Sequence, residues 1–417
     1  MKRAVYVNCD GLCVDWISPE LTPAIHGLGQ AGLRATAHRS ITPSVTRPSA
    51  ASIATGCRPA RHGLHGNRMA LVEDGRLVVH DVGPPGFAAH MRRVLGRTLL
   101  VPTMAERLAG SGGFVAYSNV SPGAAAFLDP DGFGEVRHRA GSHGPRLTAL
   151  PPLDVSHDLA GDEAMTRMFC ERVVEGARPA AAILWLANPD LTLHGEPLGS
   201  PAHREALART DACVRAVLEA VERRRAAGED LLLLVGSDHG QETVHEGVDL
   251  RAWAARVGLA EALDQGRLAF ATQGTAFFVY AMEPEGALAG RAVAALRAEP
   301  WVGEVVTGTG LGALGVPDGE GLVAVVDMAR IPAANAHGVP GQRFAAFESA
   351  AFRGVGFGQH GGWGPDETRP FLVADHPAWA AGEITRTTSL VDVAPTILSF
   401  LGEPEGGMDG IPLAPAA

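Results

Sequence analysis

Four apolar, β-rich runs that end in polar or glycine-containing turns constrain the fold of this chain more than any other feature. They are "AVYVNCDG" at 4–11, "FVAYSNV" at 114–120, "AAILWLAN" at 181–188 and "LLLLVGSDHG" at 231–240. Such near-continuous apolarity is typical of strands that are covered on both faces. Helical patterns lie between the runs; one at 200–228 has Ser200 as its N-cap, Pro201 as its first residue and Gly228 at its end. The alternation predicts an α/β protein whose ligands bind beyond the carboxyl ends of the strands.

The pattern changes between residues 246 and 355. An apolar run at 274–284 is followed by an Ala-rich helical pattern at 286–300 and by a further β-rich run at 321–328. We interpret 246–355 as a small α+β cap domain, inserted into a core that comprises 1–245 and 356–417. Within the core, "DVGPPGFAAH" at 81–90 is typical of a loop.

Composition limits the partners of the chain. The 417 residues, 46% hydrophobic and 19% charged, can bury a large core. With 46 acidic and 35 basic residues and no Lys/Arg block, the net charge of -11 argues against bulk nucleic acid and anionic membranes as partners. A small anionic substrate would need a local positive site such as a bound metal. A homo-oligomer is compatible with this composition.

The first residues of the chain and the spacing of its cysteines indicate in which cellular compartment we expect the protein. "MKRAVYVNCDG" has no apolar segment followed by a small-residue cleavage site, and no run of about 18 apolar residues appears. The cysteines, five in number, have no disulfide-framework spacing. We therefore expect reduced thiols in a cytoplasmic protein.

Asp and His residues gather where the predicted strands end. Each alone is more typical of a turn or a helix cap than of a metal ligand. Together with one hydroxyl they provide the side chains that zinc accepts, in sufficient number for two neighbouring ions. These candidates are Asp10, Thr46, Asp190, His194, Asp238, His239 and His360. The same ligand types also accept manganese or iron.

The motifs around these residues resemble the alkaline phosphatase superfamily. They are "NCDG", "TRPSAASIATG…RHGLHGN", "NPDLTLHG", "SDHGQ", "GQHGG" and "TSLVDVAPTILSFLGEP…MDGIPL", spread from residue 10 to 413. Within it the chain is most similar to the type I phosphodiesterase and nucleotide pyrophosphatase branch, which includes phosphonoacetate hydrolase. The resemblance implies a three-layer α/β/α core with an inserted cap and a metal-dependent phosphoric ester hydrolase.

The resemblance also implies a role for each candidate. Asp190, His194 and His360 would hold one zinc ion. Asp10, Asp238 and His239 would hold the other. Thr46 would bind the second ion and attack phosphorus, since a bound cation converts a weak hydroxyl nucleophile into an alkoxide.

Cys57 is a rival nucleophile, because Cys57-Arg58-Pro59-Ala60-Arg61 has the Cys-x-Pro-x-Arg spelling of the sulfatase formylglycine site. In sulfatases that cysteine precedes a helix ending in Thr-Gly, ten positions before the glycine. Here Thr46 lies ten residues before Gly56, and Cys57 follows the Thr-Gly pair. The position therefore favours Thr46, with a positive helix end facing the phosphoryl oxygens.

The substrate contacts depart from those of the relatives. Phosphodiesterase relatives usually carry Asn three residues after the nucleophile, where this chain has Ser49. Arg47 offers a guanidinium to an anionic substrate, and Asn67 and Arg68 are further pocket candidates. Phosphonoacetate hydrolase relatives place lysines near the substrate carboxylate, whereas lysine is almost absent from this chain.

The sequence thus predicts a two-zinc hydrolase that cleaves a phosphodiester or phosphonate through a covalent phospho-threonine. One alternative is a phosphonoacetate-type C–P hydrolase, and another is a phosphomonoesterase or sulfatase. A metal-binding scaffold without catalysis is the alternative from a different class.

Overall fold

The structure of the chain is a computed structural model, which describes residues 2–348 and 353–413. Residues 349–352 of the predicted cap, and residues 1 and 414–417 of the predicted core, lie outside the described residues. Within the described ranges, no helix combines the length and the apolarity needed to cross a membrane.

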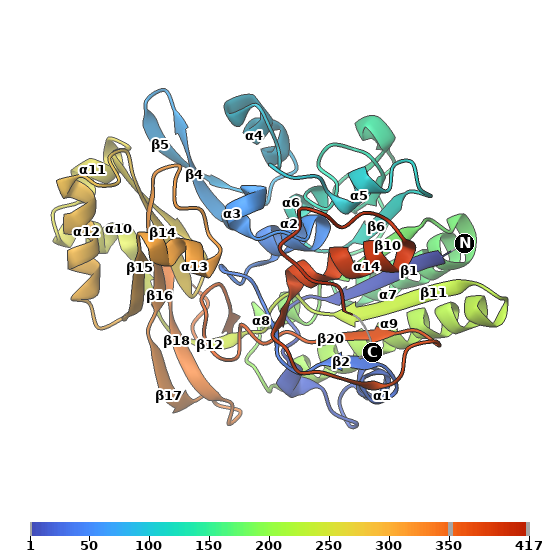
Figure 1. Cartoon of the computed structure of the whole chain (residues 1–417). Coiled ribbons are helices and arrows are strands. Elements are labelled where there is room, and N and C mark those ends of the chain that lie inside the picture. Colours follow the sequence, from blue (N-terminus) through green and yellow to red (C-terminus); the bar gives the residue numbers. More distant parts are fainter. Residues whose placement is uncertain (1, 349–352, 414–417) are drawn as a thin grey trace.

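A ten-stranded sheet is the largest sheet of the molecule and contains all four apolar runs (Figure 1). Its strands are β1 (Lys2–Cys9), β2 (Leu33–Ala35), β6 (Phe114–Ser118), β7 (Glu135–Arg137), β8 (Ser142–Gly144), β9 (Thr148–Leu150), β10 (Ala181–Leu186), β11 (Asp230–Gly236), β20 (Leu372–Asp375) and β21 (Gly382–Ile384). They lie in the order β21-β2-β20-β11-β1-β10-β6-β7-β8-β9. The neighbours β11, β1, β10 and β6 are parallel, so their carboxyl ends meet at one edge of the sheet.

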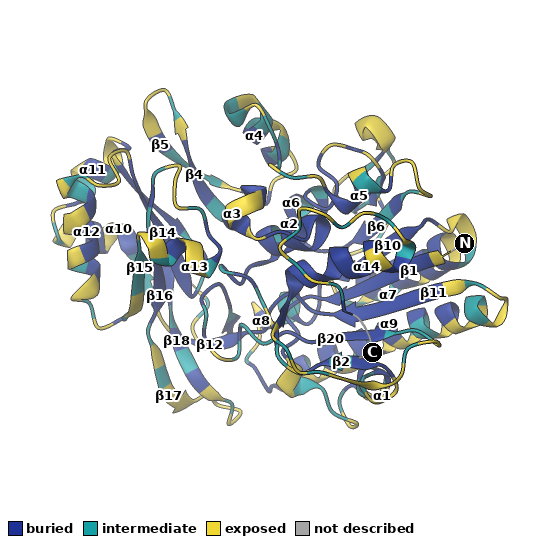
Figure 2. Ribbon diagram, in the orientation of Figure 1, coloured by how far each residue is buried: buried dark blue, intermediate teal, exposed yellow. Residues whose placement is uncertain are grey.

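Helices cover both faces of this sheet, as the continuous apolarity of its strands requires. On β1, Tyr6 packs into one apolar core, whereas Val5 and Val7 pack into the core on the opposite face. The Tyr6 side is covered by α2 (Thr46–Thr55), α5 (Met104–Arg107), α6 (Pro122–Ala126) and α14 (Val393–Leu401). The other side is covered by α1 (Pro23–Ala31), α7 (Leu159–Phe169) and α9 (Pro201–Ala226). Figure 2 shows the central strands buried between these layers, which form the predicted three-layer α/β/α core.

The long helix α9 begins where the sequence predicts. The Ser200 side chain accepts a hydrogen bond from the backbone N–H of His203, and Pro201 is the first helical residue. The helix ends at Ala226, two residues before Gly228, whose φ is +90°.

Two smaller sheets lie to one side of the main sheet (Figure 1). One consists of β12 (Glu242–Asp249), β17 (Arg330–Ala334), β18 (Pro340–Phe347) and β19 (Gly358–Gln359), in the order β17-β18-β12-β19. The other consists of β13 (Leu268–Thr272), β14 (Ala276–Ala281), β15 (Val302–Thr307) and β16 (Leu322–Met328), in the order β13-β14-β16-β15. With them run α10 (Leu250–Arg256), α11 (Ala260–Asp264), α12 (Ala287–Arg297) and α13 (Thr309–Leu314). Trp253 and Phe277 belong to an apolar core of this region that is distinct from the two cores of the main sheet.

The predicted loop at 81–90 is partly wrong. A hairpin of β4 (Arg68–Glu73) and β5 (Arg76–Asp81) leads into helix α4 (Phe87–Leu95). Phe87 and Met91, four residues apart, face the same way and are buried. The Gly and Pro residues just before Phe87 hid this short apolar repeat in the sequence.

The remaining elements are short connections. They are β3 (His38–Arg39), β22 (Thr388–Ser389), α3 (Pro59–His62), α8 (Asp190–Leu193), η1 (Val14–Trp16), η2 (Pro145–Leu147), η3 (Cys170–Ala177) and η4 (Leu390–Asp392).

Candidate active site

The first set of potential metal ligands consists of Asp190, His194 and His360, whose ligand atoms all lie within 4.8 Å of one another. Asp190 opens α8 after β10, and His194 follows one helical turn later, so the two side chains are neighbours. His360 follows β19. The Nε2 atoms of His194 and His360 lie 3.3 and 3.4 Å from the two carboxylate oxygens of Asp190. Side chains this close can ligate one ion.

The second set consists of Asp10, Asp238 and His239, which meet the same limit of 4.8 Å and are all buried. Asp10 follows β1, and the other two follow the adjacent parallel strand β11. The Nε2 atom of His239 lies 3.4 Å from Oδ1 of Asp10 and 3.2 Å from Oδ2 of Asp238. Parallel pairing therefore brings residues from distant parts of the chain into one set.

The two sets adjoin each other. The imidazole rings of His239 and His360 stack with their centroids 3.7 Å apart. The backbone N–H of Asp190 donates to the carbonyl of Asp10 over 3.1 Å. Gly11 makes this approach possible, because its φ is +72° and a Cβ there would lie 2.8 Å from Cβ of Asp190.

Backbone carbonyls orient two of the imidazoles. Nδ1 of His239 lies 3.0 Å from the carbonyl oxygen of Gly240, and Nδ1 of His360 lies 2.7 Å from that of Ser44. Because a carbonyl oxygen only accepts, each Nδ1 carries the proton and donates it. The Nε2 lone pairs are then available for a metal, which is the usual arrangement of metal-binding histidines.

The buried carboxylates fit bound cations. Oδ1 of Asp10 and Oδ2 of Asp238 are buried and have no hydrogen-bond partner among the described residues. Burial, together with the charges of Asp238 and Asp190, raises the pKa of Asp10 well above its ordinary value. Burial also raises the pKa of Asp238. Buried carboxylate oxygens without a hydrogen-bond donor are costly in the absence of a cation, and an Asp/His donor set suits zinc, manganese or iron.

Thr46 lies beside the second set. Its Oγ1 is 3.3 Å from Nε2 of His239, and it is the first residue of α2. The N-cap of this helix is Val45, and no side chain caps it. The Thr46 hydroxyl is therefore turned toward the metal ligands and does not act as a helix cap.

Cys57 lies at the other end of α2, beyond Gly56, about 15 Å along the helix axis from Thr46. The thiol is buried, with Sγ 3.7 Å from the carbonyl oxygen of Gly407. Burial raises the pKa of the Cys57 thiol, which disfavours the reactive thiolate. The structure thus separates Cys57 from both ligand sets.

A cavity of about 360 Å³ opens over the two sets. Thr46, Arg47, Asn67 and Arg68 are all in its wall. Nε of Arg47 donates to the hydroxyl of Ser121 over 3.2 Å, and its backbone N–H donates to Oδ1 of Asn67 over 3.1 Å. The structure therefore brings three of the four predicted substrate contacts to the nucleophile.

Two of the predicted contacts are more restricted than the sequence suggests. Ser49 is fully buried one helical turn beyond Thr46 and does not line the cavity, so the structure does not place it with the other contacts. Arg68 lines the cavity, but its Nη2 lies 3.2 Å from Oε2 of Glu348. That ion pair engages part of the guanidinium.

Sequence reasoning missed some residues of the cavity wall, among them Ser121, His157 and Gln273. Ser121 is followed by a proline and caps α6, a pattern that is readable in the sequence. Oε1 of Gln273 accepts from the N–H of Asn67 over 2.7 Å, and its Nε2 donates to the carbonyl of Arg68 over 2.6 Å. No local signal marks Gln273, because it reaches the site from the turn between β13 and β14.

Comparisons with known proteins bear on the family and the fold of the chain. Residues 4–302 match the family model of type I phosphodiesterase / nucleotide pyrophosphatase. No curated protein sequence matches the chain.

Solved structures of a murine and a human protein share the fold. Murine ectonucleotide pyrophosphatase/phosphodiesterase 5, in an inactive threonine-to-alanine variant in complex with AMP, is 16% identical with a TM-score of 0.70, and the match covers 99% of this chain and 98% of the other. The same murine protein without that substitution is 16% identical with a TM-score of 0.69, and the match covers 98% of this chain and 97% of the other. The human counterpart is 16% identical with a TM-score of 0.67, and the match covers 99% of this chain and 97% of the other.

Proposed function

The chain belongs to the type I phosphodiesterase and nucleotide pyrophosphatase family of the alkaline phosphatase superfamily, and we propose how its own residues perform the hydrolysis. Membership of this family makes the protein a metal-dependent phosphoric ester hydrolase. In this proposal it cleaves a phosphodiester or a phosphonate with two zinc ions, and Thr46 forms a covalent intermediate. The observation that carries the proposal is the Thr46 hydroxyl, which lies 3.3 Å from Nε2 of His239 in the second ligand set. The inactive threonine-to-alanine variant of the murine relative is consistent with this role.

In this proposal the metal ligands divide as the resemblance to the family implies. Asp190, His194 and His360 would hold one ion. Asp10, Asp238 and His239 would hold the other, together with the Thr46 oxygen. When bound, two zinc ions supply positive charge that lowers the pKa of the nucleophile and neutralises the leaving oxygen.

The covalent chemistry takes place at Thr46. Its Oγ1 forms a bond to phosphorus while the bond to the leaving group breaks, and the leaving group departs with a proton. Water then cleaves the phospho-threonine, which releases the phosphoryl product and restores the hydroxyl. Asn67 orients its amide by accepting the Arg47 N–H at Oδ1, so its Nδ2 serves as a donor to a phosphoryl oxygen.

The cavity wall favours an ester over phosphonoacetate. A carboxylate substrate group would need a free cation, but Arg68 is paired with Glu348 over 3.2 Å and Arg47 lies 3.8 Å from Asp81. The AMP complex of the murine relative supports a phosphoryl compound of nucleotide size as the small anionic substrate. The five cysteines are all free, which is consistent with the proposed cytoplasmic location.

The decisive experiment replaces the nucleophile. We expect Thr46→Ala to lower kcat on bis-p-nitrophenyl phosphate by about three orders of magnitude or more, because no covalent intermediate forms. The matched Thr46→Ser variant keeps a hydroxyl at the same place and should retain part of the activity. Metal analysis of both variants should still find the zinc bound. Full activity in Thr46→Ala would rule out this nucleophile.

A parallel substrate panel separates the alternatives. The wild-type protein is assayed on bis-p-nitrophenyl phosphate, p-nitrophenyl phosphate, p-nitrophenyl sulfate and phosphonoacetate at equal concentrations. We expect the highest kcat/KM on the diester. A preference for phosphonoacetate would instead assign the C–P hydrolase reaction to this site, and a preference for the sulfate would contradict the choice of Thr46 over Cys57.

A further inference from the structure

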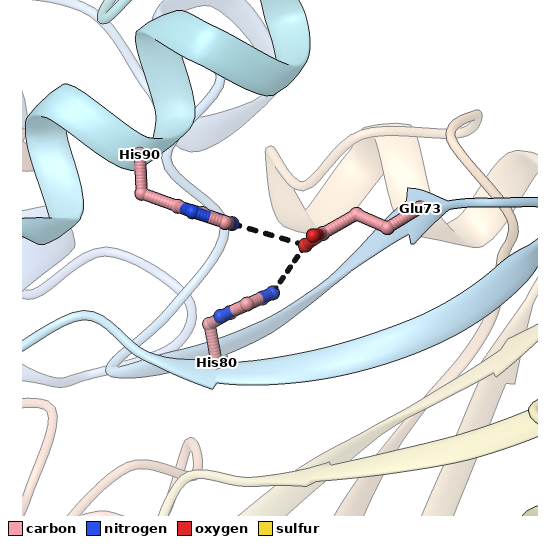
Figure 3. A group of neighbouring side chains, drawn as sticks. All are labelled: Glu73, His80 and His90. Atoms are coloured by element: carbon pink, nitrogen blue, oxygen red, sulfur yellow. Dashed lines mark hydrogen bonds and ion pairs between the residues drawn. The ribbon is translucent and has the colours of Figure 1, made fainter.

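A third group of metal-ligating side chains lies outside the active site, on the hairpin β4–β5 and helix α4. It consists of Glu73, His80 and His90, and one ligand atom from each lies within 4.8 Å of the others (Figure 3). Nε2 of His80 is 2.5 Å and Nε2 of His90 is 3.0 Å from the same oxygen, Oε1 of Glu73. The two imidazole centroids are 4.5 Å apart. These three side chains therefore converge on one point from two separate elements.

The fold holds this convergence in place. In the hairpin, His80 pairs with Met69, and Glu73 lies four residues beyond Met69 on β4. An even spacing places both ligands on one face of the hairpin, the face that meets α4. Phe87 and Met91 bury one side of α4 in the core under the hairpin, which directs the adjacent His90 to Glu73.

The chemistry of the group matches a metal site. Two imidazole nitrogens and one carboxylate oxygen are the donor set that zinc accepts, with further positions left for water. The three side chains are only 22–25% exposed, so they are ordered by packing yet open to an ion from solvent.

We propose that Glu73, His80 and His90 bind a divalent ion of the zinc class, which fastens α4 to the β4–β5 hairpin. This site is independent of the two ligand sets at Thr46. It has a connection to them, because the next residue after His80 is Asp81, which lines the active-site cavity 3.8 Å from Arg47. A bound ion would therefore fix the end of β5 that carries this wall residue.

In the metal-free state, Arg93 holds His90 in a protonation state that disfavours metal binding. Its Nη2 lies 2.7 Å from Nδ1 of His90, and a guanidinium only donates, so Nδ1 accepts and the ring proton resides on Nε2. Ligation at Nε2 requires that proton to move to Nδ1 and Arg93 to swing away. Arg93 is exposed, so this movement is not blocked. Removal of the Arg93 side chain should consequently tighten metal binding.

The test counts ions per chain in the full-length protein. Wild type, His90→Gln, His80→Gln and Arg93→Ala are equilibrated with zinc, dialysed and analysed for metal. We expect His90→Gln and His80→Gln to hold about one zinc ion fewer than wild type, and Arg93→Ala to hold as many as wild type and to retain it against more chelator. His26→Gln, on α1 away from the site, is the matched control and should hold as many ions as wild type.

The difference of one ion does not depend on how many ions the active site binds, so failure of the proposed function leaves this test intact. Phosphodiester hydrolysis by each variant reports whether the active site is folded. As a second measurement, zinc should slow amide hydrogen exchange across residues 68–95 in wild type and leave it unchanged in His90→Gln. Equal metal content in wild type and in both histidine variants, or no zinc-dependent slowing in wild type, would show that the three side chains form a hydrogen-bonded cluster only.

Discussion

At the scale of single residues, the cavity is shaped by a chain of hydrogen bonds that begins outside the main sheet. Gln273 accepts from the N–H of Asn67, and Asn67 accepts from the N–H of Arg47, next to Thr46. Gly66 permits this contact, because a Cβ there would lie 2.4 Å from Oε1 of Gln273. Gln273 is thus a positioning residue that links a smaller sheet to the nucleophile.

We predict that Asn67→Ala lowers kcat by about 10²–10³-fold with a smaller change in KM, because its amide stabilises charge that develops in the transition state. Steady-state kinetics on a diester measure this effect. Gln273→Ala leaves the amide present but less well held, and should cost less. A change confined to KM in Asn67→Ala would instead indicate uniform substrate binding.

At the scale of elements, the turn after β19 delivers His360 to the first ligand set. The next residue, Gly361, has φ +130°, and a Cβ there would lie 1.6 Å from the carbonyl oxygen of Gln273. The backbone N–H of Gly361 also donates to Oγ of Ser44 over 3.1 Å. The turn therefore requires glycine both for its conformation and for its close packing.

We predict that Gly361→Ala displaces His360 and lowers zinc affinity at the first set while the second set keeps its ion. Metal titration monitored by activity and by metal content measures the loss. Gly27→Ala is the matched control, because Gly27 lies inside helix α1 and a Cβ added there would meet no neighbouring atom within 4 Å. Unchanged zinc binding in Gly361→Ala would contradict the importance of this turn.

At the scale of the whole molecule, three strands of the main sheet are each followed by an aspartate at the same edge of the sheet. Asp10 follows β1, Asp190 follows β10 and Asp238 follows β11. Burial and repulsion from Asp238 and Asp190 raise the pKa of Asp10, and burial raises the pKa of Asp238, so these two carboxylates oppose folding when no cation balances them. Bound metal should accordingly stabilise the fold as well as the reaction.

We predict that removal of metal by a chelator lowers Tm by roughly 5–10 °C and that added zinc restores it. Differential scanning calorimetry measures the shift. His90→Gln separates the sites, because its remaining metal effect arises only at the two ligand sets near Thr46. A Tm that stays constant while metal analysis shows the zinc removed would contradict this coupling.

The sequence by itself determined the fold class, and it named the candidate members of the two ligand sets. Both are recorded locally: continuous apolar runs predict covered strands, and polar residues such as Asp10 and Asp238 come directly after them. The position of Thr46 relative to Gly56 likewise separated it from Cys57 without any structure. Parallel strands bring their ends together, so order along the chain was sufficient to predict that Asp10, Asp190 and Asp238 lie at one edge of the sheet, whereas the division into two sets came from the resemblance to a family.

Only the tertiary structure decided which other side chains share the site. Whether Ser49 or Asn67 reaches the cavity depends on the direction of side chains on packed elements, and Gln273 comes from a sheet more than 200 residues along the chain from Asn67. The group of Glu73, His80 and His90 likewise exists only because α4 packs against a hairpin. Contacts between separate elements depend on packing, and periodicity along a single segment carries no information about it.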